Sequence, residues 1–184
     1  MPRVNLRRLS STGCPSSERS RVAERAIRLF GDPVLRSACD PVRIGDARAA
    51  ALVEDLLETV ALPGRAGLAA NQIGVGLRAF SYNIDGEIGY VINPELVEVS
   101  GDAELVDEGC LSVPGFYFPR KRYPFARVVG VDLEGNPVEL SGDGLMAQAL
   151  QHEVDHLDGH LYIEGLAPET KKEAMRLIRM APWY

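Results

Sequence analysis

One stretch near the carboxyl end of the chain constrains it most, because it carries the pattern His-Glu-x-x-His. The pattern covers His152, Glu153 and His156. On an α-helix, residues four apart lie one above the other on the same face, so the two imidazoles can bind one metal ion. Glu153 lies about 100° further round the helix. A carboxylate there is close to the metal without being a ligand, which suits a base that handles the proton of a metal-bound water.

The surroundings of this pattern favour a buried metal site. A lone pair of histidines four apart on a surface helix is usually two solvated side chains. Here the predicted helix also carries apolar residues, namely Leu145, Met146, Leu150 and Leu157. Two imidazoles do not complete a metal site, so a third ligand is expected elsewhere in the chain.

Cysteine is the best source of that third ligand. The chain has three cysteines, Cys14, Cys39 and Cys110. An odd and sparse set makes a poor disulfide framework and indicates a reducing compartment. Cys110 follows Gly109, which leaves space around the sulfur, and precedes Leu111, whose backbone N–H would lie beside the metal. A buried structural cysteine is the ordinary alternative, but a thiolate is a good ligand for zinc or iron, and we predict that Cys110 is the third ligand.

A second unusual stretch, residues 64–72, consists of small residues and ends in the carboxamide of Gln72. Small residues let a backbone approach a ligand or another chain closely. A buried glutamine offers an N–H donor without a charge, which suits stabilisation of an oxyanion. The alternative is a tight loop and helix cap with a solvated Gln72.

Taken in order, these three stretches resemble the motifs of the peptide deformylase family. The family patterns are Gly-x-Gly-Leu-Ala-Ala-x-Gln, Glu-Gly-Cys-Leu-Ser and Gln-His-Glu-x-Asp-His-Leu-x-Gly. They correspond here to residues 65–72, 108–112 and 151–159, and the likeness runs from about Ile27 to Tyr162. One position departs from the first pattern, because Arg65 replaces its first glycine. We expect the Arg65 side chain to turn outward rather than to contact a substrate.

The resemblance implies an enzyme that removes the N-formyl group from the N-terminal formyl-methionine of new polypeptides and releases formate. It implies one divalent metal ion, ferrous iron, with zinc or nickel able to replace it. The metal ligands would be Cys110, His152 and His156. A metal-bound hydroxide would attack the formyl carbon, with Glu153 as general base and acid. The Gln72 amide and the Leu111 backbone N–H would stabilise the oxyanion.

The resemblance also implies how the substrate binds. An extended peptide would lie along the loop at Gly67 and a strand edge, making main-chain hydrogen bonds. An apolar pocket for the methionine side chain would be formed by Leu111, Leu145, Ala149 and the ring of His152. The expected partners are nascent chains at the ribosome.

Hydrophobic patterns and turn signals predict an α+β fold. A helix begins after Asp46 and ends at Pro63-Gly64, and a last helix covers 168–180. Strands are expected over 77–84, 88–92, 96–100, 126–133 and 137–140, with a hairpin turn at Asp85-Gly86. The metal-binding helix would run from a cap at Asp143 to Gly159. We predict mostly antiparallel sheets packed around this central helix, with a C-terminal helix.

Composition sets further limits on organisation and partners. Residues 25–184 are expected to form a single catalytic domain, and the Arg/Ser-rich residues 1–24 a disordered extension. A transit peptide to an organelle is the alternative for that segment; otherwise the protein is expected in the cytoplasm. The formal net charge of −6 argues against nucleic acid as a partner. No apolar run reaches the ~18 residues that a bilayer span requires.

Two rival functions remain open from the sequence. A metalloprotease with the same helix motif would take its third ligand from downstream, where His160 lies too close but Glu164 and Glu173 are available. A purely structural metal site would normally have four protein ligands. Only three are found here, and in such a site Glu153 and Gln72 would have no purpose.

Overall fold

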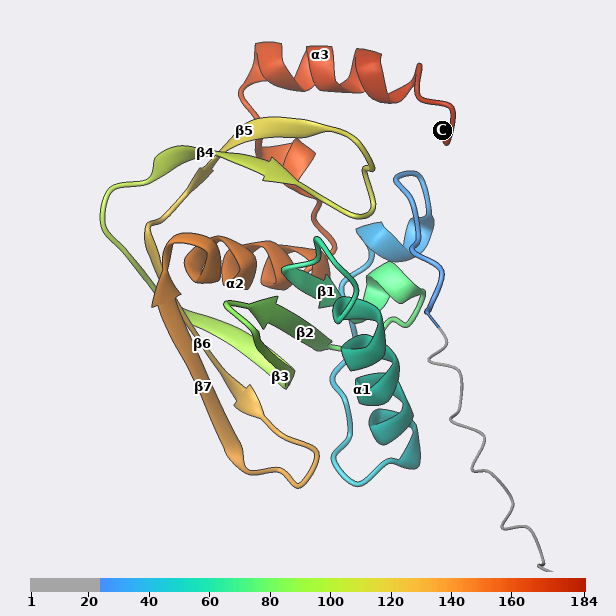
Figure 1. The fold of residues 1–184 in the computed structure, drawn as a ribbon, viewed down its shortest axis with the longest axis vertical. Coiled ribbons are helices and arrows are strands. Elements are labelled where there is room, and N and C mark those ends of the chain that lie inside the picture. Colours follow the sequence, from blue (N-terminus) through green and yellow to red (C-terminus); the bar gives the residue numbers. More distant parts are fainter. Residues whose placement is uncertain (1–23) are drawn as a thin grey trace, which may run out of the picture.

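Three α-helices and two sheets form the part of the chain that the computed structural model describes, residues 24–184 (Figure 1). The extension predicted over residues 1–24 therefore lies outside the described residues, except for Glu24. The helices are α1 (Ala47–Val60), α2 (Gly144–Leu157) and α3 (Pro168–Ile178), with short 3-10 helices η1 (Pro33–Arg36), η2 (Ala70–Ile73) and η3 (Tyr162–Gly165). Within residues 24–184, no helix is both long enough and apolar enough to cross a membrane.

Seven strands form one large sheet and one hairpin. They are β1 (Gly67–Ala69), β2 (Ala79–Ile84), β3 (Glu87–Ser100), β4 (Glu104–Gly109), β5 (Tyr117–Arg122), β6 (Phe125–Val131) and β7 (Pro137–Asp143). The large sheet has the order β1-β2-β3-β6-β7, and β4 pairs with β5 alone. Every pair of neighbouring strands is antiparallel. The predicted turn between β2 and β3 is confirmed, with positive φ at both Asp85 (53°) and Gly86 (85°).

Helices α1 and α2 cover opposite faces of the large sheet. Successive residues of a strand point to opposite faces, so the packing partners of neighbouring residues show which helix lies on which face. On β2, Phe80 belongs to the same core cluster as Leu150 of α2. Its neighbour Ala79 belongs to the cluster that contains Leu56 of α1. The next residue, Ser81, donates a hydrogen bond to the Leu56 carbonyl at 3.0 Å. This alternation makes the sheet the middle layer between the two helices.

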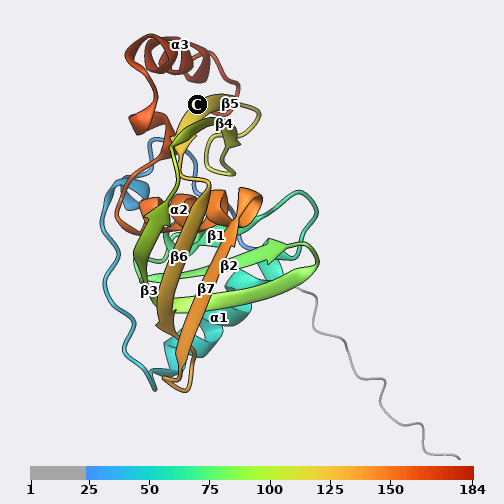
Figure 2. The ribbon, with the colours of Figure 1, turned by 90° about the vertical axis from the view of Figure 1, so that its left-hand side faces the viewer.

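Helix α2 lies between the large sheet and the β4–β5 hairpin, and α3 lies beyond the hairpin (Figures 1 and 2). One side of α2 therefore packs on the sheet and the other faces the hairpin. A third core cluster joins Phe118 of β5, Tyr162 of η3 and Ile178 of α3. The predicted α+β fold, with antiparallel sheets around a central helix and a C-terminal helix, is confirmed.

The two ends of α2 differ in how they are capped. Asp143 occupies the N-cap position, but its side chain makes no capping hydrogen bond, so that part of the prediction is wrong. At the other end, the Gly159 N–H donates to the His156 carbonyl and the His160 N–H to the Asp155 carbonyl, at 3.0 and 2.8 Å. Gly159 has a φ of 81°. This is a Schellman ending, which requires a left-handed residue after the helix.

Other predicted elements were shifted or missed. The first helix ends at Val60 rather than at Pro63-Gly64, and the predicted strands 88–92 and 96–100 are one strand, β3. Strand β1 and the β4–β5 hairpin were not predicted. Strand β5 reads Tyr-Phe-Pro-Arg-Lys-Arg, and a proline among basic residues hides the alternation that marks a strand.

A bulge in β3 explains why the two predicted strands are continuous. Asn93 has a φ of 50°, and its side-chain amide both accepts from the Val42 N–H (2.8 Å) and donates to the Val42 carbonyl (2.9 Å). Opposite this bulge, on β6, lies Gly130. A Cβ on Gly130 would be 2.7 Å from the Ile92 carbonyl oxygen. The bulge therefore requires glycine at this position.

Replacement of Gly130 by alanine should lower the free energy of unfolding by about 1–3 kcal/mol, because the backbone must shift to admit the methyl group. Gly76→Ala is the matched control, since a Cβ at Gly76 meets nothing within 4 Å. The control should stay within about 0.5 kcal/mol of the parent. Urea denaturation followed by circular dichroism measures both. Equal stability of the two variants would contradict the proposed role of Gly130.

Candidate active site

The three predicted metal ligands meet at one point. Helix α2 places the Nε2 atoms of His152 and His156 3.2 Å apart. Cys110, which follows β4, brings its sulfur to 3.1 Å from Nε2 of His156. The three ligand atoms all lie within 4.8 Å of one another. The structure thus brings together all three residues that the sequence analysis singled out.

The chemistry of these donors fits a divalent metal ion. His152 and His156 are only 9% and 1% exposed, and burial lowers the pKa of His156 well below its usual value. A neutral imidazole is the form that binds a metal. The two ring nitrogens and the sulfur are directed at one another at short distances, so a single divalent ion could be bound by all three. Nitrogen and thiolate donors suit zinc, iron and similar ions.

The cavity loop, residues 110–116, carries Cys110 and is supported on the inside by N–H donors. The Ser112 backbone N–H lies 3.3 Å from the Cys110 sulfur. The Gln72 side-chain N–H group lies 3.5 Å from the same sulfur. A Cβ on Gly109 would be 2.5 Å from the ring of Tyr117. Glycine at 109 therefore makes room for the Tyr117 ring.

Gln72 is held in one orientation. It lies in η2, is 1% exposed, and its Oε1 accepts from the Ala69 N–H at 2.9 Å. Its Nε2 then points to the Ser112 hydroxyl (3.3 Å) and toward Cys110. The predicted alternative of a solvated Gln72 is wrong, because this amide is buried with its N–H donors directed at the centre.

Glu153 is buried next to His152 on α2, and one of its carboxylate oxygens lacks a hydrogen-bond partner among the described residues. The residue is 3% exposed, and the oxygen that lacks a partner there is Oε2. Burial raises the pKa of this carboxyl to about 7. A Cβ at Gly67 would collide with the Glu153 carboxylate. Glycine at 67 thus lets β1 approach the carboxylate closely.

A buried charge network that the sequence analysis missed orients His152. Glu108 binds Nδ1 of His152 at 2.7 Å and pairs with Arg122 at 2.7 Å through both carboxylate oxygens. Arg122 also contacts Asp155 of α2 at 2.7 Å. Although burial acts to raise it, hydrogen bonds from Arg122 and His152 lower the pKa of Glu108 to about 2. Little in the sequence signals this pair: β5 buries Phe118 and Arg122 on one face, but its proline and basic residues hide that alternation.

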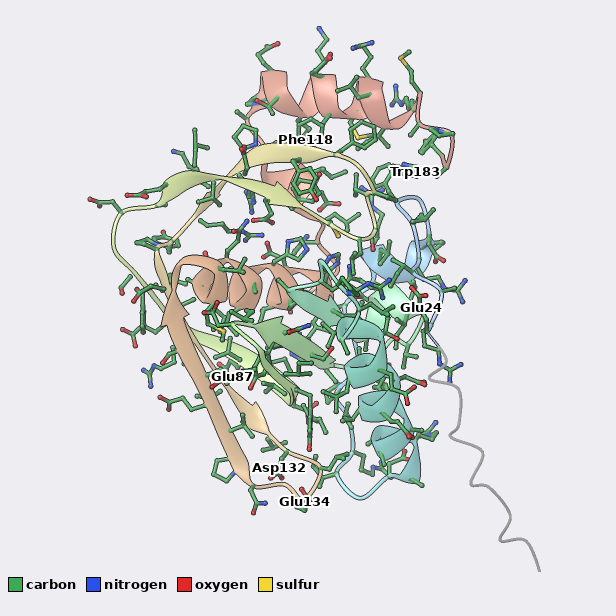
Figure 3. The ribbon with its side chains drawn as sticks, in the orientation of Figure 1. Glu24, Glu87, Phe118, Asp132, Glu134 and Trp183 are labelled. Atoms are coloured by element: carbon green, nitrogen blue, oxygen red, sulfur yellow. The ribbon has the colours of Figure 1, made fainter. Side chains whose placement is uncertain are left out.

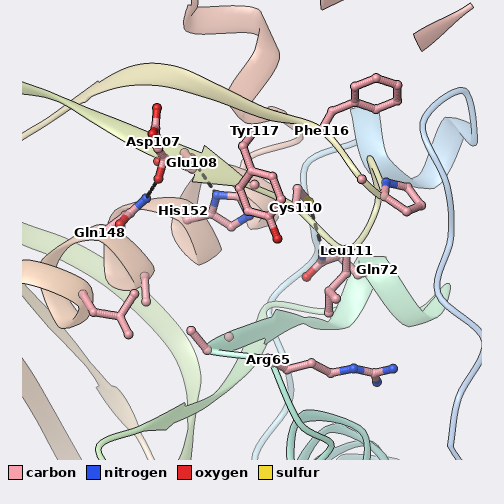
Figure 4. Close-up of a pocket in the computed structure, with 18 residues that line it drawn as sticks. Arg65, Gln72, Asp107, Glu108, Cys110, Leu111, Phe116, Tyr117, Gln148 and His152 are labelled. Carbon is pink, nitrogen blue, oxygen red and sulfur yellow. Dashed lines mark hydrogen bonds and ion pairs between the residues drawn. The ribbon is translucent and has the colours of Figure 1, made fainter. Parts of the chain in front are cut away.

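A cavity of about 390 Å³ opens beside His152 and Cys110 (Figure 4). The predicted substrate-binding residues all line it, namely Gly67, Leu111, Leu145 and Ala149. Ala149 is 7% exposed, whereas Leu145 is 51% exposed. Gln148, on the same helix face, donates to the Asp107 carbonyl at 3.2 Å and so joins α2 to β4.

The Arg65 side chain turns away from the ligands, as expected. Its guanidinium donates to the Thr59 carbonyl at 2.8 Å and pairs with Glu24. Thr59 is in the last turn of α1, so Arg65 satisfies a carbonyl that the helix leaves unpaired. The residue still borders the cavity, and Figure 4 shows the side chain extending away from His152.

The downstream acidic residues do not contribute to the centre. Glu164 pairs with Arg36 and His160, and Glu173 pairs with Arg176 on the exposed side of α3. Within residues 24–184, the group with metal-ligand geometry is Cys110, His152 and His156. A metalloprotease that uses Glu164 or Glu173 as its third ligand is therefore excluded.

The His-Glu-x-x-His helix, the neighbouring thiol and the adjoining cavity are typical of metallohydrolases. The sequence model described as polypeptide deformylase matches residues 24–172. A peptide deformylase of Acidothermus cellulolyticus is 49% identical over 162 residues, covering 88% of this chain and 89% of the relative. The chain belongs to the polypeptide deformylase family, hydrolases that act on a linear amide bond.

Solved structures agree with this assignment. A peptide deformylase from Legionella pneumophila superposes with a TM-score of 0.79 at 38% identity, covering 86% of this chain and 95% of that one. A peptide deformylase from Thermotoga maritima superposes with a TM-score of 0.74 at 36% identity, covering 79% and 99%. At these identities the likeness extends to sequence as well as fold.

Replacing Glu108 with glutamine should weaken metal binding by about 10–100-fold, because the partner that orients His152 loses its charge. Glu98→Gln is the control, since Glu98 pairs with Arg127 on an exposed part of β3. Competition of each folded variant with a chelator measures the affinity. Equal affinity of both variants would show that Glu108 does not act on the metal site.

Proposed function

We propose that this protein removes the formyl group from the N-terminal formyl-methionine of newly made polypeptides and releases formate. The observation that carries the proposal is the meeting of Cys110, His152 and His156 beside a buried Glu153, at the side of a cavity. Membership of the deformylase family supports the same reaction.

One divalent ion would be held by Cys110, His152 and His156. We propose ferrous iron in the cell, with zinc or nickel able to replace it, since this donor set accepts several divalent ions. When bound, the ion supplies activation of a water molecule for attack on the formyl carbon. Burial of the histidines and the neutral state of His156 support this assignment.

Three groups of the chain would carry out the proton transfer and the charge stabilisation. Glu153 takes a proton from the attacking water and returns it to the leaving amine. Its free Oε2 and its burial support that role. The Gln72 amide and the Leu111 backbone N–H stabilise the oxyanion; loss of one such donor typically costs about 2.7–4 kcal/mol of barrier. The contact of Gln72 with Ala69 orients this donor before the substrate arrives.

The substrate would bind as an added strand. β1 is one of the two edge strands of the large sheet, and its first residue, Gly67, lines the cavity. An extended peptide can therefore form main-chain hydrogen bonds with β1, which makes recognition independent of sequence beyond the first residue. The methionine side chain would enter the apolar part of the cavity, between Leu111, Leu145 and Ala149 and against the ring of His152.

The substrates in the cell would be nascent chains at the ribosome, and we propose the cytoplasm as the location. Targeting to an organelle is the alternative. We expect no direct binding to nucleic acid, because the net charge of −6 opposes the phosphate backbone.

Formate release from formyl-Met-Ala-Ser by the iron-loaded protein tests the reaction, with casein digestion as the test of endoproteolysis. Glu153→Gln should keep its fold and metal content but lose about 10²–10⁴-fold in turnover, because the proton acceptor is gone. Glu169→Gln, on α3, is the control. Unchanged turnover in Glu153→Gln would remove Glu153 from the mechanism, and casein cleavage without formate release would overturn the proposed function.

Arg65→Gly should change the KM for the formyl-peptide by less than about tenfold, equivalent to ~1.4 kcal/mol. The reason is that the guanidinium is directed to Thr59 and Glu24, not to the cavity. Steady-state kinetics of the metal-loaded variant measures the change. A larger rise in KM, with turnover maintained, would place Arg65 in contact with the substrate.

A further inference from the structure

An uninterrupted series of aromatic rings connects the segment after α3 to a metal ligand. The ring centroids are 6.2 Å apart for Trp183 and Phe116, 6.2 Å for Phe116 and Phe118, and 6.4 Å for Phe118 and Tyr162. Tyr162 then lies 6.2 Å from the ring of His152. Figure 3 shows Phe118 and Trp183 between α3 and the rest of the molecule. The catalytic helix and the end of the described chain thus belong to one packed unit.

Two side-chain donors hold the backbone of the cavity loop. The indole N–H of Trp183 donates to the Pro114 carbonyl at 3.1 Å. The Tyr162 hydroxyl donates to the Phe116 carbonyl at 3.0 Å. Pro114 and Phe116 both line the cavity. The cavity wall at Pro114–Phe116 is therefore positioned by Trp183 and Tyr162, which do not line the cavity themselves.

The loop has weak internal support between these two points. The hydrogen bond from the Phe116 N–H to the Val113 carbonyl is 3.4 Å long, near the limit for such a bond. Gly115, between Pro114 and Phe116, has a φ of 81° and nothing within 4 Å of where its Cβ would be. The end of the loop at Cys110 is better supported, because the Val113 N–H donates to the Cys110 carbonyl at 2.9 Å. Loss of the outer contacts would free the wall while leaving the turn at Cys110 intact.

We propose that Trp183 is a positioning residue for substrate binding, which fixes the cavity wall at Pro114–Phe116 through its indole N–H and its packing on Phe116. The inference rests on the proposed function, because it assigns the wall to the peptide substrate. Trp183 acts on the wall rather than on the metal ligands. Its loss should therefore raise KM and leave the chemical step nearly unchanged.

Kinetics of three metal-loaded variants test the role. Trp183→Ala removes both contacts and should raise the KM for formyl-Met-Ala-Ser about tenfold, with kcat within about twofold of the parent. Trp183→Phe keeps a ring but loses the N–H donor and should raise KM about threefold. Met180→Ala, in the same segment but 72% exposed, should leave KM unchanged. Metal content should be equal in all three.

Several outcomes would overturn the proposal. Unchanged KM in Trp183→Ala would do so, as would a fall in kcat and metal content with KM constant, which is the result of a purely structural role. If Trp183→Ala does not fold, Trp183→Phe decides alone, and a KM equal to that of the parent overturns the proposal. An absence of formate release in the parent protein would instead count against the proposed function.

Fluorescence gives a readout that does not depend on turnover. Trp183 is the one tryptophan in the chain, so the intrinsic emission reports on the wall it contacts. Addition of the deformylated peptide Met-Ala-Ser to the metal-loaded protein should change the intensity or wavelength of this emission. Peptide binding, measured by calorimetry, without any change in emission would overturn the proposed role of Trp183 in substrate binding.

Discussion

The convergence of one thiol and two imidazoles is the interaction on which the rest of this structure depends. The histidines need only one helix, because their spacing places both on one face. The thiol needs the β4–β5 hairpin, which lies across α2 and directs Cys110 toward the His156 ring at 3.1 Å. The sheet, the hairpin and α3 all pack so that this contact is made in a buried place.

Burial of that centre explains the charges around it. An ion taken out of water loses several kcal/mol of solvation, and this loss is recovered only through close partners. Glu108 and Arg122 are 2% and 5% exposed and satisfy each other through two hydrogen bonds. With its pKa at about 2, Glu108 stays ionised and holds Nδ1 of His152. The Nε2 atom is then left facing His156 and would be free to bind a metal ion, which is the usual arrangement of a ligating histidine.

The motif departure at Arg65 shows how the fold accommodates a large residue at the edge of a cavity. Helix α1 ends nearby, and the Thr59 carbonyl has no partner within the helix. The Arg65 guanidinium donates to it instead. A charged side chain thereby contributes to a helix end and is directed away from His152 (Figure 4). The other side of the cavity is formed by Pro114 and Phe116, whose positions depend on α3 and η3 through Trp183 and Tyr162.

The sequence by itself determined the features whose physical cause is local. Helix α2 was predicted from the spacing of His152 and His156. The β2–β3 hairpin was predicted from the Asp85-Gly86 turn, and the fold class from the apolar runs and turn signals. The motifs also indicated that Cys110 would meet the histidines, but only the tertiary structure decided which other distant groups meet. Arg122 of β5 pairs with Glu108 of β4, and both strands are rich in charged residues, with a proline in β5, so neither carries a clear strand pattern. Trp183 donates to the Pro114 carbonyl from the segment after α3. Such contacts depend on how layers stack in three dimensions, and residue spacing along the chain contains no record of that stacking.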